Sequence, residues 1–283
     1  MVPDHFTRKA GFLALLLVIL GSAFALSSDA QSQRDQAWTV LQSALSDSKP
    51  ETRAIAIRAL TVVTSDPKAV AAAEKALADQ DPDVRAAAAG ALGILKAKSS
   101  IPKLTAALKD QQGSVVMAAA HALVLLGSEK GYSVYYALVT GQRKSGQGIV
   151  GSEEKEMDEA LRHPDQLASE AFEQGIGYVP YGGVAMGVFQ HFHDSGKSEA
   201  LVKAAAVKML AKDPDSRSGQ ALVGATSDKE WVVRAAAYDA LARRGDRSLL
   251  SAAANGMNDS EKTVQLMSAA AAVQLSAPRA EGK

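Results

Sequence analysis

Apolar and polar positions along most of the chain follow the period of an α-helix. Between residues 82 and 96, apolar side chains recur three or four residues apart, at Val84, Ala87, Ala88, Ala91, Leu92 and Leu95. Alanine and leucine, which make up most of this pattern, are the strongest helix formers. We therefore predict a helix over 82–96 and a second helix over 67–79. A strand is not expected, because alanine is disfavoured in sheets and no period-two alternation is sustained.

Asp-Pro pairs mark the predicted beginning of several helices. The pairs are Asp66-Pro67, Asp81-Pro82 and Asp213-Pro214. An aspartate before a helix accepts hydrogen bonds from its free N–H groups, and proline at the first helical position loses nothing by lacking an N–H. We expect one helix to begin at each pair.

An internal repeat organises these helices. One nine-residue motif recurs six times. It begins with an apolar and a basic residue, continues with alanine-like residues and ends in Ala-Leu. It occurs at 52–60, 84–92, 115–123, 202–210, 233–241 and 264–272. Its second position holds Arg53, Arg85, Val116, Lys203, Arg234 and Gln265, at intervals of 32, 31, 87, 31 and 31 residues. Because 87 is not a multiple of the period, two repeat triplets flank a non-repetitive central insertion. Each repeat is a helix pair that buries its apolar face only by stacking on its neighbours.

These repeats resemble HEAT repeats, and most closely the short bacterial kind also found in phycobilin lyases. The phrases DQDPDVRAAA at 79–88 and SDKEWVVRAAA at 227–237 carry the resemblance, which covers about 34–126 and 196–276. It implies an all-α fold, a right-handed α-solenoid of the HEAT/armadillo type, with the second helix of each pair on the concave face. It also implies a ladder of turn aspartates and helix arginines, for which Asp81 with Arg85 and Asp228 with Arg234 fit best.

One column of the repeat alignment varies in chemistry while its neighbours stay alanine or leucine. Five residues past the arginine position, it holds Arg58, Gly90, His121, Lys208, Asp239 and Ala270. If the second helices face inward, this column faces the concave side. Arg58, His121, Lys208 and Asp239 are then candidates for contact with a partner. The alternative interpretation is that these are unselected residues facing solvent.

The N-terminus has the layout of a secretory signal peptide. Arg8 and Lys9 precede an apolar run, and Ala23-Phe24-Ala25 forms a small-x-small cleavage site. We expect residues 1–25 to be removed and the mature protein to be periplasmic or secreted, without a membrane span; an uncleaved anchor is the alternative. The expected organisation is then repeats over 26–126, a central segment over 127–195, repeats over 196–276 and a tail over 277–283.

The central segment differs in composition from the repeats. It holds eight of the aromatic residues, at Tyr132, Tyr135, Tyr136, Phe172, Tyr178, Tyr181, Phe189 and Phe192, and 11 of the 22 glycines. Long insertions in compact folds are often functional, so Tyr178, Tyr181 and Phe189 are further candidates for partner binding. The alternative is a degenerate repeat whose aromatic side chains fill an irregular core. A membrane-surface role for 172–192 ranks last, because the segment lacks a basic polar face.

Metal and catalytic signals are weak. His191 and His193 are the only candidates for metal ligands, and the sequence offers no second cluster to complete a site. No nucleophile elbow frames a serine, and no P-loop lysine follows the glycines near residue 146. We therefore predict no enzyme activity and no cofactor. Lyase activity is improbable, because such enzymes act on pigment proteins inside the cell whereas this chain carries an export signal.

Charge and cysteine content narrow the function further. Lysine plus arginine and aspartate plus glutamate number 31 each, and there is no cysteine. A chain without a basic excess gives no reason to expect a nucleic-acid partner, and one without cysteine cannot form disulfides or thiolate sites. The sequence predicts an exported, non-catalytic scaffold that binds a protein or peptide through its concave face, its central aromatic loop or both. A small-ligand or metal-binding protein that uses the central segment is the alternative.

Overall fold

A computed structural model describes residues 29–139 and 198–277 of the chain, and both ranges consist of helices joined by short turns. The first range contains a helix over 29–45 followed by α2 (Pro50–Ala59), α3 (Pro67–Ala76), α4 (Pro82–Ile94), α5 (Ile101–Ala107), α6 (Gly113–Leu125) and α7 (Lys130–Val139). The second contains α11 (Ser198–Leu210), α12 (Ser216–Ala225), α13 (Trp231–Arg244), α14 (Leu250–Ala254) and α15 (Lys262–Leu275). Short 3₁₀ turns lie at η1 (Leu60–Val62), η2 (Lys98–Ser100), η4 (Arg247–Leu249) and η5 (Asn255–Asn258). With no strand among the described residues, the predicted all-α solenoid is confirmed.

Two of the three Asp-Pro predictions are confirmed at the level of single hydrogen bonds. Asp66 accepts from the N–H of Lys68 at the start of α3, and Asp81 accepts from two N–H groups at the start of α4. The third prediction is wrong, since α12 begins at Ser216 and its capping residue is Asp215. Asp213 instead accepts bonds from the Asp215 N–H and the Ser218 hydroxyl. This local turn delays the beginning of the helix by two residues.

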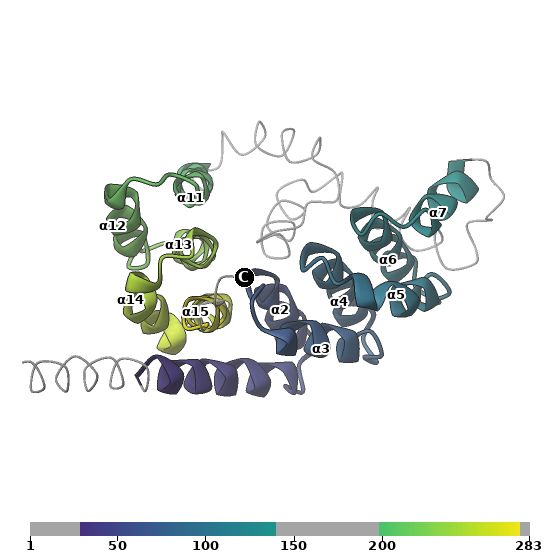
Figure 1. Cartoon of the computed structure of the whole chain (residues 1–283), viewed down its shortest axis with the longest axis horizontal. Coiled ribbons are helices and arrows are strands. Elements are labelled where there is room, and N and C mark those ends of the chain that lie inside the picture. The colour runs from purple at the N-terminus through teal and green to yellow at the C-terminus, as the bar shows by residue number, and fades with distance from the viewer. Residues whose placement is uncertain (1–28, 140–197, 278–283) are drawn as a thin grey trace, which may run out of the picture.

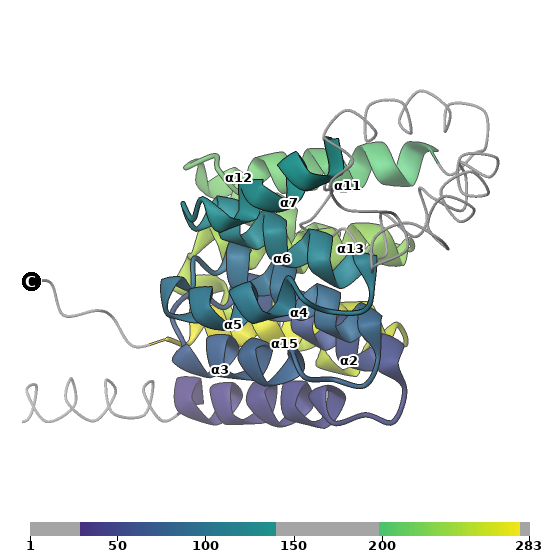
Figure 2. The ribbon, with the colours of Figure 1, turned by 90° about the vertical axis from the view of Figure 1, so that its right-hand side faces the viewer.

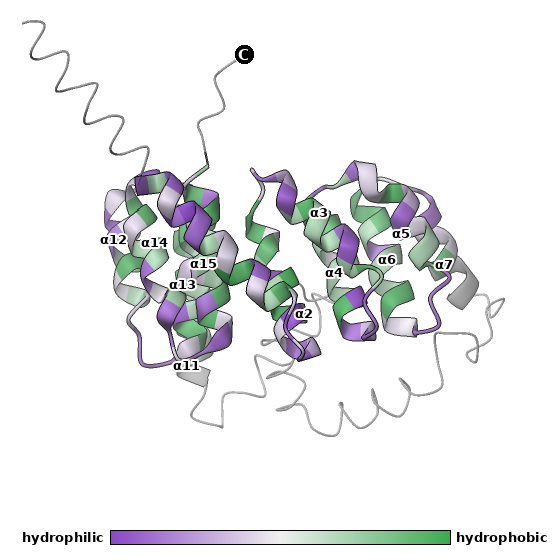
Figure 3. Cartoon of the chain, turned by 90° about the horizontal axis from the view of Figure 1, so that it is seen from below, coloured by the Kyte–Doolittle hydropathy of each residue, from purple (hydrophilic) through white to green (hydrophobic). Residues whose placement is uncertain are grey.

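The helices form two layers bent into an arch. The inner helices pack side by side in the order α11, α13, α15, α2, α4, α6, and Figure 1 shows them along the concave side. The outer helices, which are α12, α14, α3, α5 and the helix over 29–45, lie on the convex side. Each of α3, α5, α12 and α14 packs on the inner helix that follows it in sequence. Figure 2 shows the layers from the side. In Figure 3 the loops that join the helices are mostly hydrophilic, as expected at the edges of a stack.

The order of the repeats in space differs from their order in the chain. The last inner helix, α15, packs against α2 and η1, which belong to the first repeat. The C-terminal triplet therefore precedes the N-terminal triplet in the stack. A single hydrophobic cluster runs through the junction and includes Ile57 and Leu60 on one side with Leu266 and Val273 on the other. The two triplets thus form one solenoid, although residues 140–197 lie between them in the sequence.

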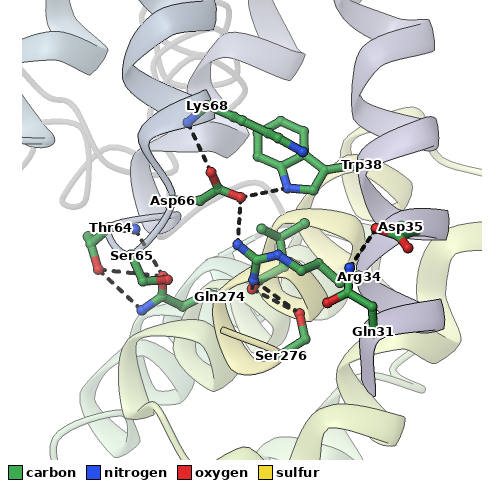
Figure 4. A network of polar contacts seen from close by, with 11 residues as sticks. Gln31, Arg34, Asp35, Trp38, Thr64, Ser65, Asp66, Lys68, Gln274 and Ser276 are labelled. Atoms are coloured by element: carbon green, nitrogen blue, oxygen red, sulfur yellow. Dashed lines mark hydrogen bonds and ion pairs between the residues drawn. The ribbon is translucent and has the colours of Figure 1, made fainter. Parts of the chain in front are cut away.

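A buried polar network closes this junction, as Figure 4 shows. The Asp66 carboxylate accepts from Arg34 Nη2 at 2.5 Å, from Trp38 Nε1 at 2.8 Å and from the Lys68 N–H at 2.9 Å. Arg34 also donates to the Val273 carbonyl oxygen at 2.9 Å, which ties the first helix to the end of α15. Beside it, Gln274 Oε1 accepts from the Thr64 N–H at 2.9 Å. Residues more than 200 positions apart are therefore joined by hydrogen bonds.

Candidate functional site on the inner face

The variable column lies on the concave side of the inner helices. In α15, Ser268 faces the outer layer, because its hydroxyl donates to the Ala253 carbonyl of α14 at 2.6 Å. The column residue Ala270 lies two positions later and therefore, at 100° per residue, about 200° around the helix from Ser268. In spatial order the inner column consists of Lys208, Asp239, Ala270, Arg58, Gly90 and His121.

Arg58 is a half-buried cation near the middle of the arch. Burial lowers the pKa of its guanidinium, and the charge of Asp83 on α4 offsets only part of this effect. Its side chain forms no hydrogen bond or ion pair with any residue that the structure describes. A guanidinium carries five N–H donors, so this site can accept an anionic group from outside the described chain.

Small, buried residues lie on both sides of Arg58 in the column. Ala270 lies at the column position of the neighbouring helix α15, and Gly90 lies at the column position of α4 on the other side. A Cβ atom placed on Gly90 would meet no heavy atom within 4 Å. Further along the column, burial lowers the pKa of His121, which favours its neutral form.

Lys208 is the second half-buried cation of the column. Burial lowers the pKa of its ammonium group, the charge of Asp239 raises it in part, and the charge of Arg243 lowers it further. Lys208 also lacks a hydrogen bond or ion pair within the described ranges. The two cations Arg58 and Lys208 thus come from inner helices of opposite triplets, α2 and α11.

Asp239 differs from its expected role as a partner contact. It is only 2% exposed, and both of its carboxylate oxygens accept from Nε of Arg243 at 3.0 Å. Its charge is therefore satisfied inside the chain, one helical turn from its partner. The exposed member of the pair is Arg243, whose side chain is 43% accessible. The alignment column does not include Arg243. Its position four residues after Asp239 could have identified it as the partner of that aspartate.

The predicted aspartate–arginine ladder exists, but its pairs differ from the expected ones. Arg85 pairs with Asp110 at 2.8 Å, not with Asp81, and Arg234 pairs with Asp259 at 2.8 Å, not with Asp228. Arg53 with Asp79 and Lys203 with Asp228 complete the set. Each basic residue therefore reaches the turn of the next repeat. Each ladder arginine also donates to backbone carbonyls within its own repeat. Arg85, for example, donates to the carbonyls of Asp79 and Gln80.

The ladder aspartates (Asp79, Asp110, Asp228 and Asp259) are held in their charged form. Hydrogen bonds from the basic partners lower the pKa of Asp79, Asp228 and Asp259 below the ordinary value of 3.8. For Asp110, burial acts to raise the pKa, but the bonds from Arg85 and the Gln112 N–H outweigh it. The ladder therefore has a structural role. At the two remaining arginine positions of the repeat, Val116 is fully buried and Gln265 donates to the Asp259 carbonyl.

Several sequence candidates lie outside the described residues. These are the aromatic candidates Tyr178, Tyr181 and Phe189, and the weak metal candidates His191 and His193. Across 29–139 and 198–277, no group of three or more His, Cys, Asp or Glu side chains is arranged to hold a metal ion. In the same ranges, no helix is both long enough and apolar enough to cross a membrane.

Comparison with known proteins identifies the family. A family model described as HEAT repeats matches residues 38–130 and 193–276, more than half of the chain. A comparison with curated proteins finds no match. Among solved structures, human deoxyhypusine hydroxylase in complex with glycerol is 14% identical, with 90% of this chain and 98% of that chain covered and a TM-score of 0.34. An engineered protein is 20% identical, with 85% and 96% covered and a TM-score of 0.27. By its repeats and by the family model, this chain belongs to the HEAT-repeat family.

Proposed function

We propose that this protein is an exported, non-catalytic HEAT-repeat scaffold that binds a protein or peptide on the inner face of its arch. The observation that carries the proposal is the inner column, where Arg58 and Lys208 are half-buried and lack partners within the described chain. Burying a cation without a partner costs free energy. A binding partner that supplies the missing contacts would offset that cost.

The shape of the fold supports the same proposal. A solenoid presents an extended concave surface built from equivalent helix faces, which suits an elongated partner. The open space above Gly90 would admit side chains of such a partner close to the inner helices. The ladder pairs, in contrast, have both charges satisfied between neighbouring repeats. We assign them to stability and not to binding or chemistry.

Export rests on the sequence of residues 1–25, which lie outside the described residues. The basic pair, the apolar run and Ala23-Phe24-Ala25 support cleavage after Ala25. Expression of the full chain in a bacterial host with a cell envelope tests this. We expect the protein in the periplasmic or secreted fraction, with Leu26 as its first residue. A cytoplasmic chain that retains residue 1 would contradict export.

A steric block of the inner face tests the binding site. Gly90→Phe adds a bulky side chain on the concave side of α4, where a Cβ meets no neighbour. The matched control is Ala71→Phe, because Ala71 is exposed on the outer helix α3. Proteins captured from an envelope extract by the wild-type chain should be lost with Gly90→Phe and retained with Ala71→Phe. Capture that is equal with both variants would place binding away from the inner face and refute the proposal.

A further inference from the structure

One end of the arch carries an exposed apolar helix face. Figure 1 shows α11 at this end, and its neighbour in the inner layer is α13. On one side of α11, Ala204, Val207 and Ala211 are buried in the common core. On the opposite side, four exposed apolar residues recur at helical spacing and form what we call the end stripe: Val202, Ala205, Ala206 and Met209. Met209 is 70% exposed and Val202 is 50% exposed.

The positions of the end stripe are buried in the other two inner helices of the same triplet. Counted in steps of 31 residues, they are Val233, Ala236, Ala237 and Ala240 in α13, and Val264, Met267, Ser268 and Ala271 in α15. Each of these eight side chains is at most 2% exposed. A solenoid that ends at a terminal repeat needs a polar outer face there. The end stripe is apolar, so it has the character of a surface that another segment covers.

One hydrogen bond shows which part of a repeat lies over this face. Ser268, at the third position of the stripe in α15, donates to the Ala253 carbonyl oxygen at 2.6 Å. Ala253 belongs to α14, the outer helix before α15, and is the seventh residue of an outer segment that begins at Arg247 with η4. The seventh residue of an outer segment therefore lies against the third stripe position of the inner helix that follows. For α11, the described residues include no outer helix before it.

The spacing of the repeats places the corresponding outer segment at 183–192, outside the described residues. In four repeats the outer segment begins 15 residues before the inner helix, at Pro67, Lys98, Ser216 and Arg247. Counting 15 residues back from the start of α11 gives position 183, and α3 and α12 each have ten residues. Residues 193–197 would then form a five-residue connection to α11. Connections of the same length join α3 to α4 and α12 to α13.

The sequence of 183–192 has the apolar pattern of an outer helix. In α3, the third, fourth, seventh and tenth residues pack on the core, and they are Ala69, Val70, Ala73 and Ala76. The same positions of 183–192 hold Ala185, Met186, Phe189 and Phe192. Facing helices interdigitate best when large side chains meet small ones. Two phenylalanines are therefore well matched to a stripe whose central residues are alanines.

We infer that residues 183–192 dock on the end stripe of α11, with Phe189 over Ala206. These two residues occupy the positions of Ala253 and Ser268 in the last repeat. A five-residue connection keeps the segment next to the stripe at a high effective concentration, which favours it over a second copy of the chain. The inference goes beyond the proposed function and does not depend on it. It assigns Phe189 to packing within the chain and not to partner binding.

Disulfide cross-linking tests this contact, because the chain has no cysteine of its own. After oxidation with diamide, the mature chain with Phe189→Cys and Ala206→Cys should contain an intramolecular disulfide, seen as a monomer that migrates faster on a non-reducing gel. The positive control is Ala253→Cys with Ser268→Cys, the equivalent pair in the last repeat. The matched negative control is Gln190→Cys with Ala206→Cys, since position 190 lies about 100° from position 189 on a helix and away from its apolar side.

Two gel results would overturn the inference. One is the absence of a cross-link between positions 189 and 206 while the positive control forms its disulfide. The other is a covalent dimer of the Phe189→Cys/Ala206→Cys chain, which would place a second copy on the end stripe.

Thiol labelling of single variants gives a second measurement that does not depend on disulfide geometry. A maleimide dye should react with Ala206→Cys about tenfold more slowly than with Ala71→Cys, because Ala71 is exposed on α3. Adding Phe189→Ser and Phe192→Ser should remove this protection. Equal labelling rates for Ala206→Cys and Ala71→Cys would overturn the inference. Neither assay uses a captured partner, so a negative result here leaves binding on the inner face to be decided by Gly90→Phe.

Discussion

The junction between the two triplets makes a quantitative prediction about Asp66. Its carboxylate caps α3 through the Lys68 N–H, accepts from the buried Trp38 indole and pairs with Arg34, while its side chain is only 6% exposed. Asp66→Ala removes all three acceptor contacts at once. Asp81→Ala is a matched control, since Asp81 also caps a helix, α4, but forms no ion pair within the described residues.

The magnitudes follow from what each variant leaves unsatisfied. Loss of a helix cap costs about 1 kcal/mol. A buried indole N–H without an acceptor adds roughly 1–3 kcal/mol. Arg34, which is 12% exposed, keeps its bond to the Val273 carbonyl, and its unpaired charge adds about 1–3 kcal/mol. We expect Asp66→Ala to lower the free energy of unfolding by about 3–7 kcal/mol and Asp81→Ala by about 1 kcal/mol.

Urea unfolding followed by circular dichroism at pH 7 measures both variants under the same conditions. The change in m-value shows whether the transition stays cooperative, because weakening the junction would let the two triplets unfold separately. A difference between the two variants below about 1 kcal/mol, the scale of the cap alone, would refute the junction as a stabilising contact. So would an m-value change in Asp81→Ala equal to that in Asp66→Ala.

Three further predictions concern the inner helices and the ladder. Gly90→Ala should stabilise α4 by about 0.5–1 kcal/mol. Gly93→Ala should destabilise the protein in the same thermal unfolding assay, because its Cβ would lie 2.9 Å from Ala122 Cα. A higher unfolding midpoint for Gly93→Ala than for Gly90→Ala would contradict the packing of α4 on α6. Arg58→Met should raise the free energy of unfolding by about 1 kcal/mol, because it removes a half-buried cation without a described partner, whereas Arg85→Met should lower it. A lower free energy of unfolding in both variants would show that Arg58 is a structural residue. The ladder aspartates have folded pKa values below 3.8, so their contribution is present above the unfolded pKa and is lost as the pH falls through the folded values. The unfolding midpoint should therefore be level between about pH 7 and 5 and fall below about pH 4; a midpoint that rises below pH 4 would contradict the ladder.

The candidate site was predictable in part. The repeat alignment placed Arg58 and Lys208 at equivalent positions of their helices, and these helices, α2 and α11, both belong to the inner layer. The alignment did not show that Asp239 is buried. It gives the position of a side chain around its helix and not how deeply that side chain is covered by other residues. The ladder shows the same distinction. Arg85 was paired with Asp81, four residues away, but its carboxylate partner is Asp110 in the next repeat, 25 residues away.

The sequence by itself determined the helices, their caps at Asp66 and Asp81, the repeat period and the inner column, because each depends on contacts within about one repeat. Tertiary structure alone decided the order of the repeats in space. The bond from Arg34 to the Val273 carbonyl joins residues 239 positions apart, and no periodic pattern encodes such a contact. Each triplet ends in a helix pair with an apolar face to bury, and the first and last repeats bury theirs against each other. That packing is what turns two separate runs of repeats into one arch with a continuous inner face.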